Sequence, residues 1–161
     1  MSKIKELLND NESVLVFDVD GVLAIMDFGE YNHYILSDEE WDRANIEGKN
    51  FYTNDRVSKK MQNFLLKKDM NRIYVITRSI TSNEFEFKKE YLNKYYNIIK
   101  ENIFFVKNDF DKKDKLKLIK EKYQNLEDYK IVMIDDTVSI LSDIMENTNF
   151  STSHISSFLD I

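Results

Sequence analysis

Four runs of consecutive apolar residues recur along the chain, at residues 14–17, 73–76, 103–106 and 131–134. An unbroken apolar run, unlike an alternating one, is typical of a strand buried on both faces of a parallel sheet. Residues 153–156 form a weaker fifth candidate. The hydrophobic pattern therefore predicts four or five short strands in a mostly parallel sheet.

Segments with helical spacing separate these runs. Within residues 55–69, the apolar side chains of Val57, Met61 and Phe64 recur near the 3.6-residue period of a helix. The other predicted helices span residues 2–9, 83–100, 112–124 and 137–146. Strands that alternate with helices indicate an α/β fold, and we expect a three-layer, Rossmann-like sandwich that forms a single domain over residues 1–161.

Composition narrows the class of protein. The 161 residues are 42% apolar, which fits one domain with a real core and excludes a disordered tail. The net charge of -6 argues against a broad nucleic-acid-binding surface, although the abundant lysines leave room for a local basic patch. There is no cysteine, and no apolar run has signal-peptide or membrane-spanning length. We expect a soluble, cytoplasmic protein without a membrane partner.

Polar residues follow three of the predicted strands. Asp18 comes after the first strand, Thr77 after the second, and the pair Asp135 and Asp136 after the fourth. Asp and Thr are also ordinary turn and cap residues, so each position alone has that simpler explanation. The carboxyl ends of parallel strands meet at one sheet edge, where such folds bind ligands. Together the three strand ends predict a functional site.

The chemistry of this site follows from its oxygen atoms. Asp18, Asp20, Asp135 and Asp136 would bring up to four carboxylates together, which is costly unless a cation or a proton neutralises part of the charge. Carboxylates without Cys or His favour a magnesium-like ion over zinc. Magnesium commonly binds one or two carboxylates together with substrate phosphate, so a phosphate ester is the natural substrate class.

These residues resemble the motifs of the haloacid dehalogenase superfamily of hydrolases. Residues 17–23, Phe-Asp-Val-Asp-Gly-Val-Leu, resemble its first motif, Thr77 the second, Lys115 the third, and the pair at 135–136 the fourth. The resemblance covers nearly the whole chain in the expected order. It implies a phosphatase in which Asp18 is the nucleophile and forms an aspartyl-phosphate.

The same resemblance implies the remaining roles. Asp20 is the general acid and then the base, a residue that the dehalogenase branch lacks. Thr77 binds the phosphoryl oxygens, and Lys115 supplies positive charge beside the nucleophile and the substrate. Mg²⁺ is held by Asp18, the backbone carbonyl of Asp20, and Asp135 or Asp136. Gly21 permits the tight turn after the first motif.

The lysine assignment has alternatives, because lysines crowd this segment at positions 112, 113, 115, 117 and 120. Lys115 is preferred because Ile119, four residues later, would face the core. Lys113 and Lys117 remain alternatives. Each of these lysines is also explained by a solvated helix face.

Neither the gap between Asp20 and the helix at 55 nor the gap between Thr77 and Lys115 holds a full cap domain. We therefore expect an open site, a small flap at residues 25–54, or cover from a neighbouring subunit. That segment contains six aromatic residues: Phe28, Tyr31, Tyr34, Trp41, Phe51 and Tyr52. They suit either base stacking or, as the favoured interpretation, a hydrophobic cluster over a sheet edge. The layout loosely resembles polynucleotide kinase 3′-phosphatase domains and small deoxyribonucleotidase-like proteins, and Arg78 is then a candidate phosphate contact. His33 and His154 lack metal-ligand spacing.

Three other readings of the site differ in testable ways. A receiver-type signalling domain also uses acids, Thr and Lys, but there the acidic pair follows the first strand, the reverse of the order found here. A non-catalytic binding or regulatory module with the same fold is a second alternative, and a phosphotransferase is the third. The substrate, whether a nucleotide, a nucleic-acid end or a small metabolite, and the oligomeric state are open at this stage.

Overall fold

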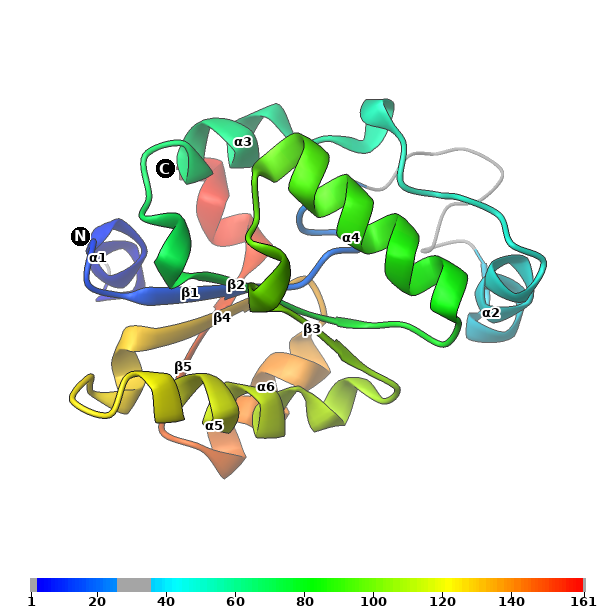
Figure 1. Cartoon of the computed structure of the whole chain (residues 1–161). Coiled ribbons are helices and arrows are strands. Elements are labelled where there is room, and N and C mark those ends of the chain that lie inside the picture. Colours follow the sequence, from blue (N-terminus) through cyan, green and yellow to red (C-terminus); the bar gives the residue numbers. More distant parts are fainter. Residues whose placement is uncertain (1–2, 26–35, 161) are drawn as a thin grey trace.

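A single parallel sheet forms the centre of the molecule. The computed structural model describes residues 3–25 and 36–160 (Figure 1). The strands are β1 (Val14–Phe17), β2 (Ile73–Arg78), β3 (Ile103–Val106), β4 (Ile131–Asp135) and β5 (Ser151–His154). They lie in the order β3-β2-β1-β4-β5, and all neighbouring pairs are parallel. The four strands predicted from unbroken apolar runs are confirmed, and the fifth begins at Ser151, two residues before the predicted start.

Helices cover both faces of the sheet (Figure 1). One layer contains α1 (Lys3–Asn9), α3 (Lys59–Leu65) and α4 (Ser82–Tyr96), and the other contains α5 (Lys112–Lys122) and α6 (Val138–Asn147). This arrangement confirms the three-layer α/β sandwich predicted from the sequence. No helix in the two described ranges is long and apolar enough to cross a membrane.

The strands are unbroken apolar runs because both faces are buried. Leu15 and Phe17 of β1 pack into the core beneath α1, α3 and α4, whereas Val14 and Val16 pack against α5 and α6. All four side chains are at most 1% exposed. Burial of one such side chain contributes about 1.5–3 kcal/mol, so the two faces together fix the register of β1 between its neighbours.

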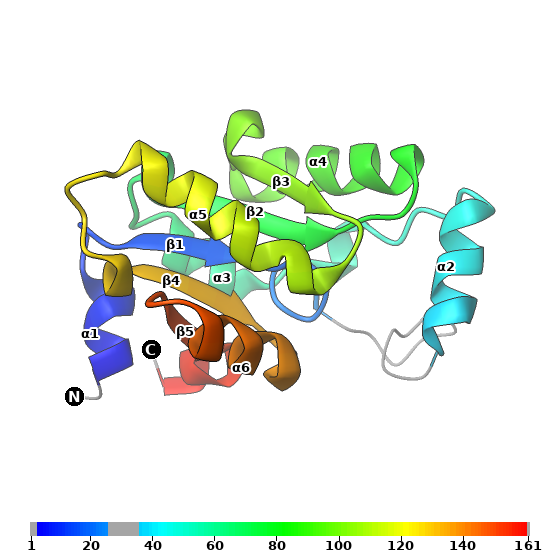
Figure 2. The ribbon, with the colours of Figure 1, turned by 90° about the horizontal axis from the view of Figure 1, so that it is seen from below.

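One α-helix of the described residues was not predicted from the sequence. Helix α2 (Asp38–Ile46) begins at a capping box, in which the Ser37 N–H donates to Glu40 Oε2 (2.9 Å) and the Glu40 N–H donates to Ser37 Oγ (3.3 Å). It lies apart from both helical layers (Figure 2). The nine residues of α2 are too few for a full cap domain, which agrees with the expected capless fold.

Candidate active site

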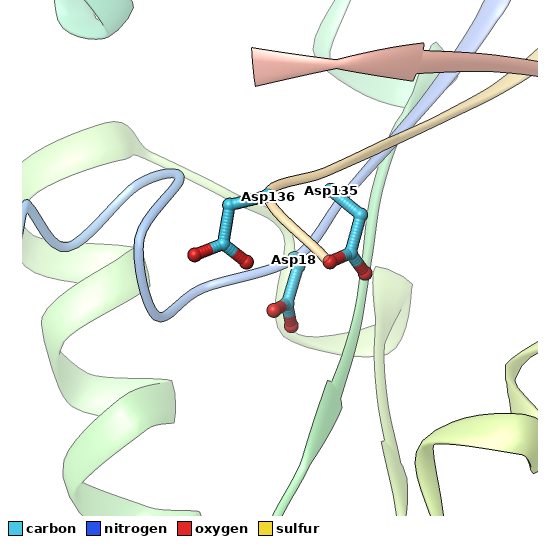
Figure 3. Close-up of side chains that lie close together, drawn as sticks. All are labelled: Asp18, Asp135 and Asp136. Carbon is cyan, nitrogen blue, oxygen red and sulfur yellow. The ribbon is translucent and has the colours of Figure 1, made fainter. Parts of the chain in front are cut away.

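The candidate site lies where the chain order of the sheet reverses. Strand β1 pairs with β2 on one side and with β4 on the other, so the crevice beyond its carboxyl end is the position where open α/β sheets bind ligands. Asp18 follows β1, Thr77 lies near the end of β2, and Asp135 ends β4. Figure 3 shows the carboxylates of Asp18, Asp135 and Asp136 turned toward one another, and one oxygen of each lies within 4.8 Å of the others.

A tight turn after β1 carries the second acid of the first motif. The N–H groups of Leu23 and Ala24 both donate to the carbonyl of Val19 (2.9 and 2.8 Å), and Gly21 donates back to the carbonyl of Ala24 (2.9 Å). Gly21 has a φ of 78°, which favours glycine and agrees with the turn predicted there. From α4, the Tyr91 hydroxyl donates to the Leu23 carbonyl (3.1 Å), so that helix supports the turn.

Asp18 is buried beside both positive and negative charge. Burial raises the pKa of its carboxyl to about 8, the nearby Lys112 opposes the rise, and Asp135 and Asp20 add to it. Lys112 Nζ lies 3.3 Å from Asp18 Oδ1, yet that oxygen accepts no hydrogen bond. A buried carboxylate oxygen in this state has a free lone pair for a cation or for bond formation.

Lys112, and not Lys115, is the lysine that contacts Asp18 and Asp135. Its Nζ lies 2.8 Å from Asp135 Oδ2, 3.3 Å from Asp18 Oδ1 and 3.0 Å from Asp109 Oδ1. Burial alone would lower the pKa of Lys112, but these carboxylates raise it overall, so the ammonium stays charged.

The predicted position of Lys115 therefore needs correction. Helix α5 begins at Lys112, and its buried stripe consists of Lys112, Leu116 and Ile119. Lys115 is only half-buried and is not among the described residues that line the cavity. Lys115 lies four residues before Ile119 but outside this buried stripe. The lysine of the stripe is Lys112, seven residues before Ile119.

The two acids after β4 have different surroundings. Asp135 is fully buried: its Oδ2 accepts from Lys112, and its Oδ1 accepts from the Thr137 N–H (2.9 Å). Asp136 is half-buried and lines the cavity. Asp18 and Asp136 therefore offer oxygens toward the cavity, while Asp135 mainly holds Lys112 in place. This donor set of carboxylates without sulfur or imidazole fits a hard divalent cation.

A second buried lysine pairs with Asp20. Lys88 of α4 lies 3.0 Å from Asp20 Oδ2 and 2.9 Å from Glu84 Oε1. The Tyr52 hydroxyl lies 3.2 and 3.3 Å from the two Asp20 oxygens, and Arg56 Nη2 lies 3.7 Å from Oδ1. Burial and the Asp20 carboxylate raise the pKa of Tyr52, so its phenol remains protonated and donates. Lys88 is not singled out from the sequence, and Tyr52 is considered there only as a base-stacking or hydrophobic-cluster aromatic.

Thr77 and Arg78 lie on the wall that β2 contributes. The buried Thr77 hydroxyl accepts a hydrogen bond from Lys88 Nζ (3.2 Å). Arg78 makes two hydrogen bonds to Asp42 of α2, from Nη1 (3.1 Å) and Nη2 (2.9 Å). Arg78, the expected phosphate contact, therefore holds α2 to the sheet, and the Arg78 side chain also lines the cavity.

The cavity at this edge has a volume of about 230 Å³. Acids and bases of the site line it together with the apolar residues Leu36, Trp41 and Ile140. Trp41 stacks on Phe51 with ring centroids 4.3 Å apart, and both rings belong to the core. The hydrophobic-cluster interpretation therefore fits these two aromatics, while α2 also reaches the cavity.

Five residues named in the sequence analysis do not line the cavity or lie outside the described part of the chain. Phe28, Tyr31, Tyr34 and His33 lie outside the described residues. His154 belongs to β5, where its Nδ1 contacts Ser156 Oγ (2.8 Å) and its Nε2 contacts the Asp136 carbonyl (3.1 Å). The imidazole thus supports the backbone behind the acidic pair.

The parallel sheet and the acids at its switch point define an α/β protein with a cluster of carboxylates at one sheet edge. Among solved structures, a protein described as a haloacid dehalogenase-like hydrolase from Burkholderia xenovorans LB400 matches with a TM-score of 0.52 at 15% identity, over 86% of this chain and 79% of that chain. DsGPDH of Dunaliella salina matches with a TM-score of 0.56 at 16% identity, over 94% of this chain. These likenesses establish a haloacid dehalogenase-like fold.

The chain spans about a quarter of the length of the Dunaliella protein, since it covers 25% of that chain. The HAD domain of effector protein Lem4 from Legionella pneumophila is a more distant match, with a TM-score of 0.45 at 14% identity. No protein-family model and no curated protein matches the sequence.

Proposed function

We propose that the protein is a magnesium-dependent phosphomonoester hydrolase that works through an aspartyl-phosphate. The observation that carries the proposal is the position of Asp18. Its buried carboxylate borders the cavity within reach of Lys112, Asp136 and Asp135, and one of its oxygens accepts no hydrogen bond. A nucleophilic carboxylate beside a cation site and an ammonium suits phosphoryl transfer.

The residues divide the reaction into two displacements. In the first, Asp18 forms a bond to phosphorus as the bond from phosphorus to the leaving oxygen breaks, and that oxygen takes a proton from Asp20. In the second, water attacks the phosphorus, Asp20 takes a proton from that water, and the bond between phosphorus and Asp18 breaks. Phosphate leaves and both carboxyl groups return to their initial state. Lys112 offsets negative charge in both steps, and Thr77 binds a phosphoryl oxygen.

Asp18, Asp136 and the backbone carbonyl of Asp20 are the groups we propose to hold Mg²⁺, with Asp135 next to them. When bound, the ion supplies charge neutralisation between nucleophile and substrate. The crowding of carboxylates at the site supports this proposal, because oxygens of Asp18, Asp135 and Asp136 lie within 4.8 Å of one another and the charge of Asp135 helps to raise the pKa of Asp18.

Removal of the metal tests the proposal directly. With p-nitrophenyl phosphate and Mg²⁺, we expect steady hydrolysis that stops after EDTA treatment and returns when Mg²⁺ is restored, while Ca²⁺ supports less activity because its coordination is larger and looser. The measurement is release of p-nitrophenol and inorganic phosphate in equal amounts. A phosphotransferase would release p-nitrophenol in excess of phosphate when an acceptor alcohol is present. An absence of hydrolysis together with an absence of Mg²⁺ binding would favour the non-catalytic module.

The charges around the cavity predict a preference among substrates. Besides the site acids, Asp38, Glu84 and Asp109 line the cavity, and the whole chain carries a net charge of -6. A polyanion approaches such a surface poorly, and steering effects change association rates by about 10- to 10³-fold. We therefore expect a nucleoside monophosphate or another small phosphomonoester to have a higher kcat/KM than a 3′- or 5′-phosphorylated oligonucleotide. A preference for the oligonucleotide at low salt would contradict this expectation.

A further inference from the structure

The Lys88 side chain connects two predicted catalytic groups. It is 1% exposed, and its ammonium contacts Asp20 Oδ2 (3.0 Å), Thr77 Oγ1 (3.2 Å), Glu84 Oε1 (2.9 Å) and the carbonyl of Arg78. Asp20 comes from the turn after β1, and Thr77 comes from β2. One ammonium on α4 therefore sets the positions of side chains from two separate segments.

Surrounding groups fix Lys88 itself. Glu84, one helical turn earlier, accepts from the Ile80 N–H (2.9 Å) and from Ser79 Oγ (3.3 Å) through Oε2, which leaves Oε1 for Lys88. Burial alone would lower the pKa of Lys88, but Asp20 and Glu84 raise it overall. A buried, fully hydrogen-bonded ammonium has little rotational freedom, so it holds the side chains that it contacts in fixed positions.

Tyr52 restrains the same carboxylate from another direction. Its hydroxyl lies 3.3 Å from Asp20 Oδ1 and 3.2 Å from Oδ2, and its ring packs against Tyr91 of α4 with centroids 5.8 Å apart. Two donors at different angles remove the rotation of the carboxylate that one donor would allow. A group that must take a proton from water needs this restraint, because a misplacement of about 1 Å costs roughly 10²-fold in rate.

We propose that Lys88 is a positioning residue, which with Tyr52 holds the Asp20 carboxylate where it activates water against the aspartyl-phosphate. The proposal rests on the proposed function and adds a residue to it. Lys88 lines the cavity, but its ammonium is occupied by Asp20, Glu84 and Thr77, so we assign its effect to Asp20 and not to contact with the substrate. Its loss therefore slows the hydrolysis of the aspartyl-phosphate and leaves the attack by Asp18 on an ester with a good leaving group largely intact.

The test compares the two steps in a charge-matched variant. Lys88→Met combined with Glu84→Gln removes one positive and one negative charge from the same buried pair, and Gln retains an acceptor for Ile80. Stopped-flow measurements with p-nitrophenyl phosphate and Mg²⁺ separate the first turnover from the steady state. The first step needs no proton donor because p-nitrophenolate is a stable leaving group. We expect a burst near one product per active site at close to the wild-type rate, followed by a steady-state rate about 10²-fold lower.

Two further variants keep the test decisive. Tyr52→Phe removes only the hydroxyl, so it tests the same restraint even where the double variant folds poorly, and we expect the same burst with a smaller loss in the steady state. Lys113→Met serves as the control, because Lys113 pairs with Asp143 outside the cavity (3.0 Å) and its loss should change neither step.

The outcomes separate this inference from the proposed function. If the wild type turns over and the Lys88 variant loses burst rate and steady-state rate equally, the substitution has damaged the structure in general. That result would overturn the positioning role alone. Unchanged steady-state turnover in both the Lys88 and Tyr52 variants would overturn it as well. A wild-type protein that releases no p-nitrophenol would overturn the proposed function and this inference together.

Discussion

Replacement of Lys112 by Met is expected to lower the free energy of unfolding by about 3–5 kcal/mol, because it breaks a buried ion pair from one side. The Lys112 side chain is 2% exposed, and Asp135, its nearest partner, is 0% exposed. Without the ammonium, Asp135 and Asp18 remain as neighbouring buried carboxylates. The measurement is urea unfolding at neutral pH in EDTA, so that a bound cation does not mask the loss.

Lys115→Met is the matched control for this experiment. Lys115 lies on the same helix and carries the same charge, but it is half-buried and does not line the cavity. Substitutions at such positions usually change stability by about 0.5 kcal/mol or less. We also expect Lys112→Met to lose at least about 10²-fold in hydrolysis, and Lys115→Met to retain it. Equal losses in the two variants would refute the assignment of Lys112 to the site.

The strands and the acids at their ends were predictable because both depend on local sequence. A strand buried on both faces must be apolar throughout, so residues 14–17 and 131–134 stand out without knowledge of their neighbours. Asp18 and Asp135 follow directly from the ends of these runs, and parallel pairing brings the ends together. The same logic located Thr77.

The two lysines were harder to place because their surroundings are tertiary. Hydrophobic periodicity treats a lysine as exposed, and Lys88 and Lys112 occupy core positions only because carboxylates from other segments meet them there. Lys112 lies in the buried stripe with Leu116 and Ile119, and this spacing indicates the correct lysine. The other lysines of the segment make the spacing hard to recognise. For Lys88, the spacing of Glu84 and Lys88 in an aromatic-rich helix was the available hint.

Helix α2 illustrates a different kind of omission. Its Ser37-x-x-Glu40 capping box is a local signal for a helix start, and the structure contains both of its hydrogen bonds. The aromatic residues of the same segment point instead to a flap or a hydrophobic cluster. Its place beside the cavity depends on the tertiary contact between Arg78 and Asp42, which no local pattern specifies.

Asp18→Asn is expected to lower hydrolysis by at least about 10³-fold, because the amide cannot serve as the attacking group. Asn has nearly the size of Asp, so the cavity should keep its shape. The assay uses p-nitrophenyl phosphate with Mg²⁺. Wild-type protein that is quenched in acid during turnover and then isolated should carry one acid-stable phosphoryl group, which the variant should lack. Asp143→Asn, on α6 and outside the cavity, is the control and should keep full activity. Retained activity in Asp18→Asn would exclude Asp18 as the nucleophile.

The same substitution should make the metal-free protein more stable at high pH. Burial raises the pKa of Asp18 to about 8, above its ordinary value of 3.8. A carboxyl with a raised pKa contributes stability at low pH, and that contribution is lost as the pH rises toward 8. In EDTA at pH 9 we therefore expect Asp18→Asn to exceed the wild type by about 1–3 kcal/mol in unfolding free energy, the cost of an unsatisfied buried group. At pH 4 the difference should nearly vanish.

Mg²⁺ should offset most or all of this difference at pH 9. A ligand that binds only the folded protein adds about 2.7 kcal/mol at 100 times its Kd. The wild type should gain this stability through its Asp18 and Asp136 ligands, whereas Asp18→Asn loses one charged ligand and should gain much less. If Mg²⁺ stabilised both proteins equally, Asp18 would not be a ligand, and the carboxylates near the end of β4 would have to hold the cation without it.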